Sequence, residues 1–236
     1  MGQFVNYDDL SSDLSIPASE GDFINKAALD SNLDIYYANS SVGTNYKIRR
    51  VFLNTTPNPT TSEISGLGAW PTAMEVSSHT VSSTNLYVGL IDGRIIKITN
   101  ADNSGASAAY LIQPGLGSVS DIHFGETEDD LFVTYYNYGS SIINVYYSSD
   151  GGTNWENKEG NDGVGDLPDI PVFAIQHNPY EEDEVIIGTE LGIWRTDNFT
   201  DTHPNWVTAD EGMSDVAVFD IDFRGTTAID NRVLAA

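Results

Sequence analysis

Hydrophobic and polar positions alternate along this chain over short runs, without the period of an amphipathic helix. Runs rich in Val, Ile, Tyr, Phe and Thr are separated by clusters of Gly, Asn, Asp, Ser and Pro, which are typical of turns. Because side chains of a strand point alternately to its two faces, this pattern predicts many short strands. The chain is therefore expected to be all-β.

A strand–turn–strand unit recurs along the chain about every 50 residues, which is the period of β-propeller blades. In one copy, Leu86–Gly89 leads through Asp92-Gly93 into Arg94–Thr99. The corresponding strands begin at Leu33, Leu131 and Val185, and a further short strand precedes each copy. The sequence predicts an all-β β-propeller of four-stranded blades. The expected blades span 22–65, 70–113, 118–160 and 170–210, with a partial blade over 215–236.

A Ser-x-Asp-Gly-Gly sequence followed by tryptophan occupies residues 148–155. Glycines supply the positive φ angles of a tight hairpin, and the Ser148 and Asp150 side chains can hydrogen-bond the backbone of their own turn. The segment resembles the Asp-box, or bacterial neuraminidase repeat, found between the third and fourth strands of a propeller blade. The resemblance implies that Ser148, Asp150, Gly152 and Trp155 are structural and lie away from any active site.

Residues 167–197 resemble a standard blade of exported bacterial Asp-box proteins. That group includes sortilin-like, xyloglucan-hydrolase-like and photosystem-assembly-like propellers. The box of this blade is degenerate: Arg195 takes the serine position, while Asp197 and Trp206 are retained as structural residues. The resemblance implies a secreted or cell-surface protein, although the segment has no signal-peptide pattern. Because an open arc would expose two apolar sheet faces, either the two ends meet to close a small ring or the chain is a piece of a longer propeller. We expect the piece, with the remaining blades in the same parent chain, because the last blade lacks its third strand and its box.

The composition is strongly acidic: 35 acidic against 10 basic residues give a formal net charge of −25. Such a surface repels phosphate backbones and anionic lipid, so no nucleic-acid partner is expected. No apolar run approaches the roughly 18 residues of a membrane helix, so no membrane insertion is expected. The absence of cysteine excludes disulfides and thiol chemistry.

In a propeller, the loops joining second to third strands and those joining one blade to the next share one face, called here the mouth. Ligand-binding candidates expected at the mouth are Trp70, Arg94 and Tyr138. The carboxylates expected there are Asp92, Asp166, Asp169, Glu190 and Asp215. In the xyloglucan-cleaving relatives, paired mouth carboxylates act as acid and base, about 6.5–9.5 Å apart in inverting enzymes. With 35 acidic residues, some reach the mouth by chance, so their presence alone does not predict catalysis.

The loop at residues 161–166 concentrates Asp, Asn and Gly, so calcium held by Asp162 and Asp166 is an alternative to a plain turn. The loop lacks EF-hand spacing. The histidines lie in separate blades without ligand spacing, so no zinc site is predicted. Phosphate-binding glycine loops, nucleophile elbows and the arginine pattern of sialidases are not found. No other cofactor is expected.

These observations favour a non-catalytic recognition module that binds a protein or a glycan through its mouth loops. The tyrosine-rich hairpin at 135–147 supplies core residues on one face and can offer a sugar-stacking platform on the other. The alternative is a secreted glycoside hydrolase of the xyloglucanase-like class with paired mouth carboxylates. A third hypothesis is an assembly factor like the photosystem-assembly propellers, whose basic binding patch is hard to reconcile with a net charge of −25.

Overall fold

The computed structural model of the chain describes residues 19–55, 58–139, 142–160, 165–209, 216–224 and 232–235. The described residues form strands and turns, with no helix that could span a membrane. The first sheet contains β1 (Ala27–Asp30), β2 (Ile35–Asn39), β3 (Lys47–Phe52) and β4 (Thr60–Ser65). The second contains β5 (Pro71–Val76), β6 (Leu86–Leu90), β7 (Ile95–Thr99) and β8 (Ser107–Tyr110).

The remaining strands continue the same order. The third sheet contains β9 (Ser118–Phe124), β10 (Leu131–Tyr136), β11 (Val145–Ser148) and β12 (Glu156–Asn157). The fourth contains β13 (Val172–His177), β14 (Val185–Thr189), β15 (Gly192–Thr196) and β16 (Val207–Thr208). A two-stranded sheet follows, with β17 (Ile221–Arg224) and β18 (Arg232–Ala235).

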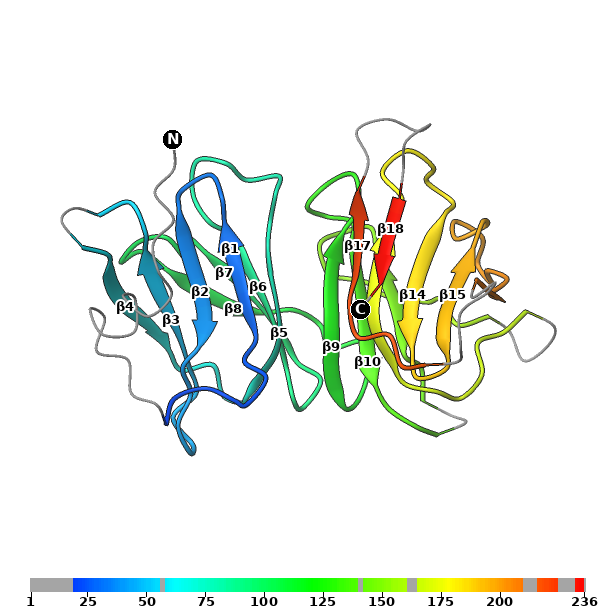
Figure 1. Cartoon of the computed structure of the whole chain (residues 1–236), viewed down its shortest axis with the longest axis horizontal. Helices are drawn as coiled ribbons and strands as arrows, with labels where there is room; N and C mark the ends of the chain where they lie inside the picture. The colour runs from blue at the N-terminus through cyan, green and yellow to red at the C-terminus, as the bar shows by residue number, and fades with distance from the viewer. Residues whose placement is uncertain are drawn as a thin grey trace.

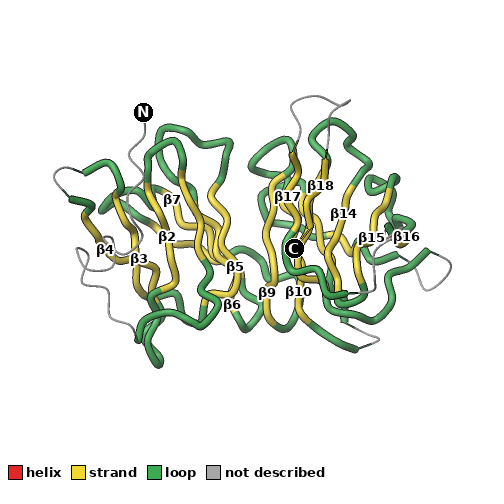
Figure 2. Tube along the Cα trace, in the orientation of Figure 1, coloured by secondary structure: helices red, strands yellow, loops and turns green. Residues whose placement is uncertain are grey.

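Each four-stranded sheet is an antiparallel meander whose strands pair in chain order. Figures 1 and 2 show the sheets standing side by side as successive blades, with the first sheet at one end and the fourth at the other. The first strands of consecutive sheets contact one another: β1 with β5, β5 with β9, β9 with β13, and β13 with β17. They therefore form a common inner wall. The prediction of an all-β propeller with four-stranded blades is confirmed.

Apolar cores lie between neighbouring sheets. In β2, Ile35 and Tyr37 are buried against Leu86, Val88 and Ile98 of the second sheet. The intervening Tyr36 is exposed because strand side chains alternate between the two faces. Similar clusters join the second sheet to the third, the third to the fourth, and the fourth to β17. Each blade thus buries a face against its neighbour, as stacked repeats require.

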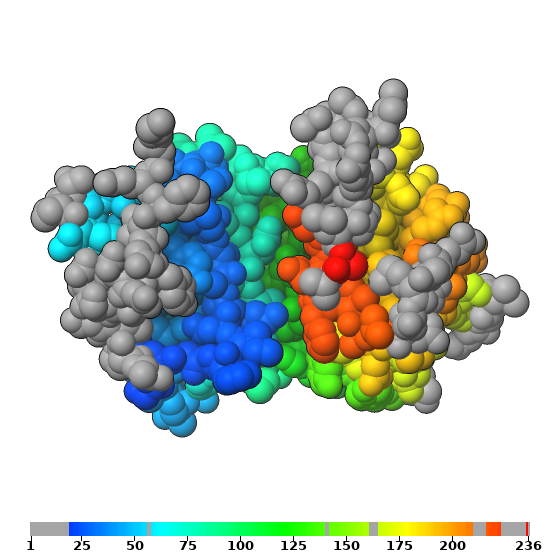
Figure 3. Space-filling model, viewed as in Figure 1, coloured from blue at the N-terminus to red at the C-terminus, as the bar shows by residue number. Residues whose placement is uncertain are grey.

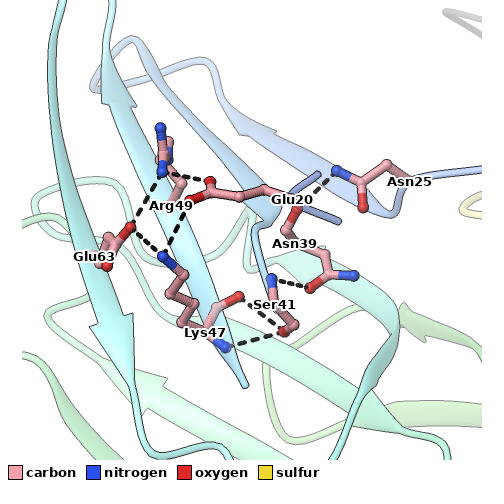
Figure 4. A network of polar contacts seen from close by, with 7 residues as sticks. All are labelled: Glu20, Asn25, Asn39, Ser41, Lys47, Arg49 and Glu63. Carbon is pink, nitrogen blue, oxygen red and sulfur yellow. Dashed lines mark hydrogen bonds and ion pairs between the residues drawn. The ribbon is translucent and has the colours of Figure 1, made fainter. Parts of the chain in front are cut away.

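The face of the first sheet that points away from the second carries a network of ion pairs (Figure 4). Lys47 Nζ lies 2.7 Å from Glu63 and 3.2 Å from Glu20, and Arg49 pairs with both carboxylates. The hydrogen bond with Glu63 raises the pKa of Lys47, and the same bond lowers the pKa of Glu63. Charge pairing therefore stabilises this part of the outward face.

Candidate binding groove

A groove of about 680 Å³ runs along the inner wall. It is lined by residues of β1, β5 and β9, by Phe173 of β13, and by Phe219 and Asp220, which precede β17. Figure 3 shows the surface hollowed between the first sheet and residues 216–224. The groove is larger than two other cavities among the described residues, which enclose about 380 and 160 Å³.

Aromatic rings form a continuous ladder along one wall of the groove, which Tyr138 extends beyond the groove lining. Ring centroids lie 6.3 Å apart for Tyr138 and Tyr136, 5.5 Å for Tyr136 and Phe173, and 4.6 Å for Phe173 and Phe219. Tyr136, Tyr138 and Phe219 are 48%, 54% and 65% exposed, although large aromatic side chains are usually buried. The ladder draws on three consecutive blades, so it is a property of the assembled fold.

Four acidic residues line the groove, Asp22, Glu75, Asp121 and Asp220. Glu75 on β5 and Asp121 on β9 come from the first strands of neighbouring blades. Burial, with a further contribution from the charge of Asp121, raises the pKa of Glu75 to about 8. Burial also raises the pKa of Asp121 to about 7, although the amides of Ile175 and Ile122 donate hydrogen bonds of 3.0 and 2.9 Å to it. At neutral pH the Glu75 carboxyl therefore holds its proton.

Of the predicted mouth residues, Asp92 and Arg94 form a pair of their own. The guanidinium donates hydrogen bonds of 2.9 and 2.6 Å to Asp92 Oδ2 and lies 4.9 Å from the ring centre of Tyr110. Partial burial opposes ionisation of Asp92, but Arg94 holds the pKa of this carboxyl below its usual range. Asp92 is therefore an ionised salt-bridge partner rather than a proton donor.

The other described mouth candidates make separate contacts. Tyr138 donates a hydrogen bond of 2.8 Å to Glu190, which raises the pKa of the phenol to about 12. Asp169 accepts a hydrogen bond from the amide of Gly139. Trp70 packs edge to face against Tyr46, with ring centroids 6.4 Å apart.

Asp166 and Asp169 share a smaller cavity of about 380 Å³. The predicted residues Asp162 and Asp215 lie outside the described residues. None of the described candidates lines the groove, although Tyr138 contacts its ladder. Within the described residues, no three His, Asp or Glu side chains are placed to hold a metal ion.

The groove residues Glu75, Asp121, Phe173 and Phe219 were not singled out from the sequence. Glu75 and Asp121 are acidic residues within short first strands whose other members are a mixture of apolar and uncharged polar residues, so no local pattern marks them. The aromatic residues come from positions far apart in the chain. Their proximity follows from the order of the blades and not from any motif.

The turn at residues 148–155 is held by hydrogen bonds between its own residues. Ser148 Oγ accepts hydrogen bonds from the amides of Asp150 and Gly152, at 3.3 and 2.9 Å. The Asp150 carboxylate accepts from the amides of Thr153 and Asn154, at 3.0 and 2.8 Å. Gly151 and Gly152 have φ angles of 69° and 86°, which L side chains rarely adopt. The turn joins β11 to β12, on the opposite side from the mouth loops.

Two tryptophans anchor the third-to-fourth-strand turns to the preceding inter-blade connection. Trp155 Nε1 donates a hydrogen bond of 2.7 Å to the carbonyl of Ile112, and Trp206 Nε1 donates one of 2.7 Å to the carbonyl of Lys158. Trp206 is 2% exposed. Both indoles thus hold a fourth strand against the neighbouring chain segment.

The fourth blade corrects the prediction for Asp197. Strand register places Thr196 opposite Val185, as Ser148 lies opposite Leu131. Asn198, rather than Asp197, then takes the place of Asp150: its amide donates to Thr196 Oγ1 at 3.3 Å. Asp197 is exposed. The prediction was wrong by one residue, because a shift of one position exchanges the two faces of a strand and the structure fixes the register at Thr196 and Val185.

No family model matches the sequence, and no curated protein matches it. Among solved structures, Hsv2 from Kluyveromyces lactis is similar, with a TM-score of 0.51 and 11% sequence identity over 93% of this chain. The chain spans 65% of the length of that structure. A likeness at this level of identity supports the β-propeller fold and carries no information on activity.

Proposed function

We propose that this chain is a non-catalytic recognition module that binds a glycan in the groove. The observation that carries the proposal is the ladder of Tyr136, Phe173 and Phe219 along one wall of the groove, extended by Tyr138. The rings of Tyr136, Tyr138 and Phe219 are exposed. The apolar faces of sugar rings pack on such side chains, and neighbouring carboxylates accept hydrogen bonds from sugar hydroxyls.

The negative charge of the groove and of the whole chain restricts the kinds of glycan that can bind. Besides the protonated Glu75, the acidic residues Asp22, Asp121 and Asp220 line the groove, and Lys26 is the only cation in its described lining. The whole chain carries a net charge of −25. A glycan rich in uronic acid or sulfate would be repelled by this field. The groove therefore suits a neutral or an amino-sugar glycan.

An array of neutral, aminated and acidic oligosaccharides, followed by titration of the best ligand, tests the proposal. Tyr136→Ala should weaken binding roughly three- to tenfold, the range expected for an aromatic contact. Tyr180→Ala, on a loop at the opposite end of the fourth blade, is the matched control and should bind normally. A peptide ligand in the groove, or glycan binding indifferent to Tyr136→Ala, would contradict the proposal.

A secreted glycoside hydrolase is the second candidate, and the carboxyl of Glu75 favours it. With a pKa of about 8, this group can deliver a proton to a glycosidic oxygen at neutral pH. Asp121, on the neighbouring blade, would be its carboxylate partner. Release of reducing ends from a polysaccharide, lost in Glu75→Gln while binding persists, would establish the hydrolase in place of the binding module.

We further propose that the chain is a secreted or cell-surface member of the Asp-box group, with further blades in its parent protein. The closed turn at 148–155 and the acidic composition support this placement. Fractionation of the native host with an antibody against this chain tests it. Detection in the cytoplasmic fraction alone would count against it.

A further inference from the structure

A second cavity, called here the interblade pocket, lies between the third and fourth sheets and encloses about 160 Å³. Its lining comes from β10, β11 and β12, from Lys158 just after β12, from the end of β13, and from the loops that follow β9, β13 and β15. In an antiparallel meander these loops lie at the opposite end of the strands from the mouth loops. The pocket is therefore distinct from the groove.

Three aromatic rings form the apolar wall of the interblade pocket. Their centroids are 5.0 Å apart for Phe132 and Tyr147, 5.2 Å for Phe132 and Phe199, and 5.6 Å for Tyr147 and Phe199. The imidazole of His177 stacks on Phe132 at 5.4 Å. The rings come from both blades, so the shape of this wall depends on how the third and fourth sheets pack.

The wall already accommodates a cation from the protein itself. Lys158 is only 2% exposed, and its ammonium lies 5.3 Å from the ring centre of Phe199 and 5.7 Å from that of Tyr147. The ammonium donates a hydrogen bond of 3.0 Å to the carbonyl of Asp201 and lies 2.9 Å from Glu156. Cations are attracted to the faces of aromatic rings, and Lys158 demonstrates this at the pocket.

The charge around the pocket exceeds what Lys158 neutralises. The carboxylates that line it belong to Glu126, Asp130, Glu156 and Glu182. Asp130 accepts a hydrogen bond of 2.9 Å from Tyr147, and Glu156 pairs with Lys158. Among the described residues, no hydrogen bond or ion pair joins the carboxylates of Glu126 and Glu182 to another side chain, although their charges act on the nearby imidazole of His177. Burial lowers the pKa of His177, so its ring is neutral at pH 7 and does not offset them.

We propose that the interblade pocket binds an organic cation of the guanidinium or alkylammonium class, with its apolar part on Phe132 and its charge toward Glu126 and Glu182. An anion is excluded by the surplus of carboxylates, and a purely apolar ligand would leave them unused. The volume matches a small group, since a cavity of about 150 Å³ holds a benzene molecule.

Nuclear magnetic resonance titration of the whole chain tests the proposal with two probes. Agmatine represents a free guanidinium, and acetyl-Gly-Arg-Gly-amide represents an arginine side chain of a partner. Both should shift the backbone amide signals of Gly125 and Thr200 saturably, whereas the citrulline peptide, which has the same shape without charge, should not. Binding of agmatine alone indicates a small-molecule source, and binding of the peptide indicates a protein; both support the proposal.

Variants at the rim connect the binding to the named carboxylates. Glu126→Gln and Glu182→Gln should each weaken binding about threefold, and together about tenfold, as expected for exposed charge pairs at separate sites. Glu181→Gln changes the net charge equally on the same loop without lining the pocket, and should bind normally. The proposal is overturned by an absence of saturable shifts, by equal binding of the citrulline peptide, or by equal weakening in Glu181→Gln.

Discussion

The phenol of Tyr87, in the second sheet, donates a hydrogen bond of 3.0 Å to Glu128, which belongs to the third. The same carboxylate accepts bonds of 2.8 Å from Ser77 and 2.5 Å from Thr80, and Lys97 Nζ lies 2.7 Å away. All these donors lie on the second blade. The side chain of Glu128 thus joins two consecutive blades through polar contacts, in addition to the apolar core between them.

Low pH should weaken the contacts of Glu128 with the second blade. Burial alone would raise the pKa of Glu128, but hydrogen bonds from Lys97, Thr80 and Ser77 outweigh it and hold the pKa at about 2. A carboxyl whose pKa is lowered from 4.5 on folding contributes stability above about pH 4.5, and this contribution is lost as the pH falls toward 2. Unfolding free energies measured from pH 7 to 2 should therefore decline less steeply for Glu128→Gln than for the wild type.

At pH 7 the same variant should cost about 1–2 kcal/mol, once solvent screening of the partly exposed group is allowed for. Glu126→Gln, on the same loop, controls for the change in net charge. Parallel pH profiles for the wild type and Glu128→Gln would show that Glu128 does not join the blades in this way.

A glycine in the second strand of the second blade, and another in the second strand of the fourth blade, allow the following blade to pack closely. A Cβ on Gly89 would lie 2.4 Å from Val119 Cγ1, and a Cβ on Gly188 would lie 2.6 Å from the carbonyl oxygen of Val218. Gly89→Ala should therefore destabilise the chain by about 1–3 kcal/mol through overpacking. Chemical denaturation measures this cost.

The double variant Gly89→Ala, Val119→Ala should recover only part of the loss, because it removes the contact with Val119 Cγ1 but leaves the Cβ of residue 119 about 2.6 Å from the new methyl group. Gly105→Ala is the control, since its Cβ would meet only the side-chain oxygen of Asn103. Additive effects of Gly89→Ala and Val119→Ala would show that the two positions are not in steric conflict.

Much of the fold could be predicted because its determinants are local. The alternation of side chains defines each strand, and turn residues such as Gly151 and Gly152 mark where the chain reverses. A repeat of about 50 residues then indicates blades. The register of a degenerate turn was harder to predict, because a slip of one residue exchanges the faces of a strand: Asn198, and not Asp197, makes the turn contacts.

The candidate site could not be predicted in the same way. The groove brings together Glu75, Asp121, Phe173 and Phe219 from different blades, and no short pattern relates these positions in the sequence. The mouth carboxylates were identified by loop position alone, whereas the pairing of Asp92 with Arg94 depends on rotamers that topology does not determine. The set of side chains that line the groove therefore depends on how neighbouring blades pack against one another.

Ser148 should contribute to stability through the turn alone. Its side chain is 1% exposed, and its hydroxyl oxygen accepts two amide hydrogen bonds while donating to Asp150 at 2.9 Å. Ser148→Ala leaves the amide of Gly152 without this partner, which costs about 1–3 kcal/mol. The melting temperature should fall by roughly 2–12 °C.

Ser149→Ala is the matched control for Ser148→Ala, because the neighbouring serine is exposed. It should melt as the wild type does. Ligand binding in the groove should be unchanged in both variants at temperatures where they are folded, since the turn lies at the other end of the blade. Loss of binding in a folded Ser148→Ala protein would give this turn a role beyond architecture.

The carboxyl of Glu75 should make the chain sensitive to alkaline pH. Burial and the charge of Asp121 raise its pKa from 4.5 to about 8, so folding favours the protonated form. The resulting stability is fully present below about pH 4.5 and is lost as the pH rises through 8. Between pH 5 and 9 the wild type should lose roughly 2–4 kcal/mol more than Glu75→Gln, which carries no titrating group at this position.

Chemical denaturation across this range measures the difference, and Glu181→Gln, on the opposite face, controls for net charge. Identical alkaline profiles for the wild type and Glu75→Gln would mean that this side chain is well solvated in the groove, and the hydrolase hypothesis would then lose its proton donor.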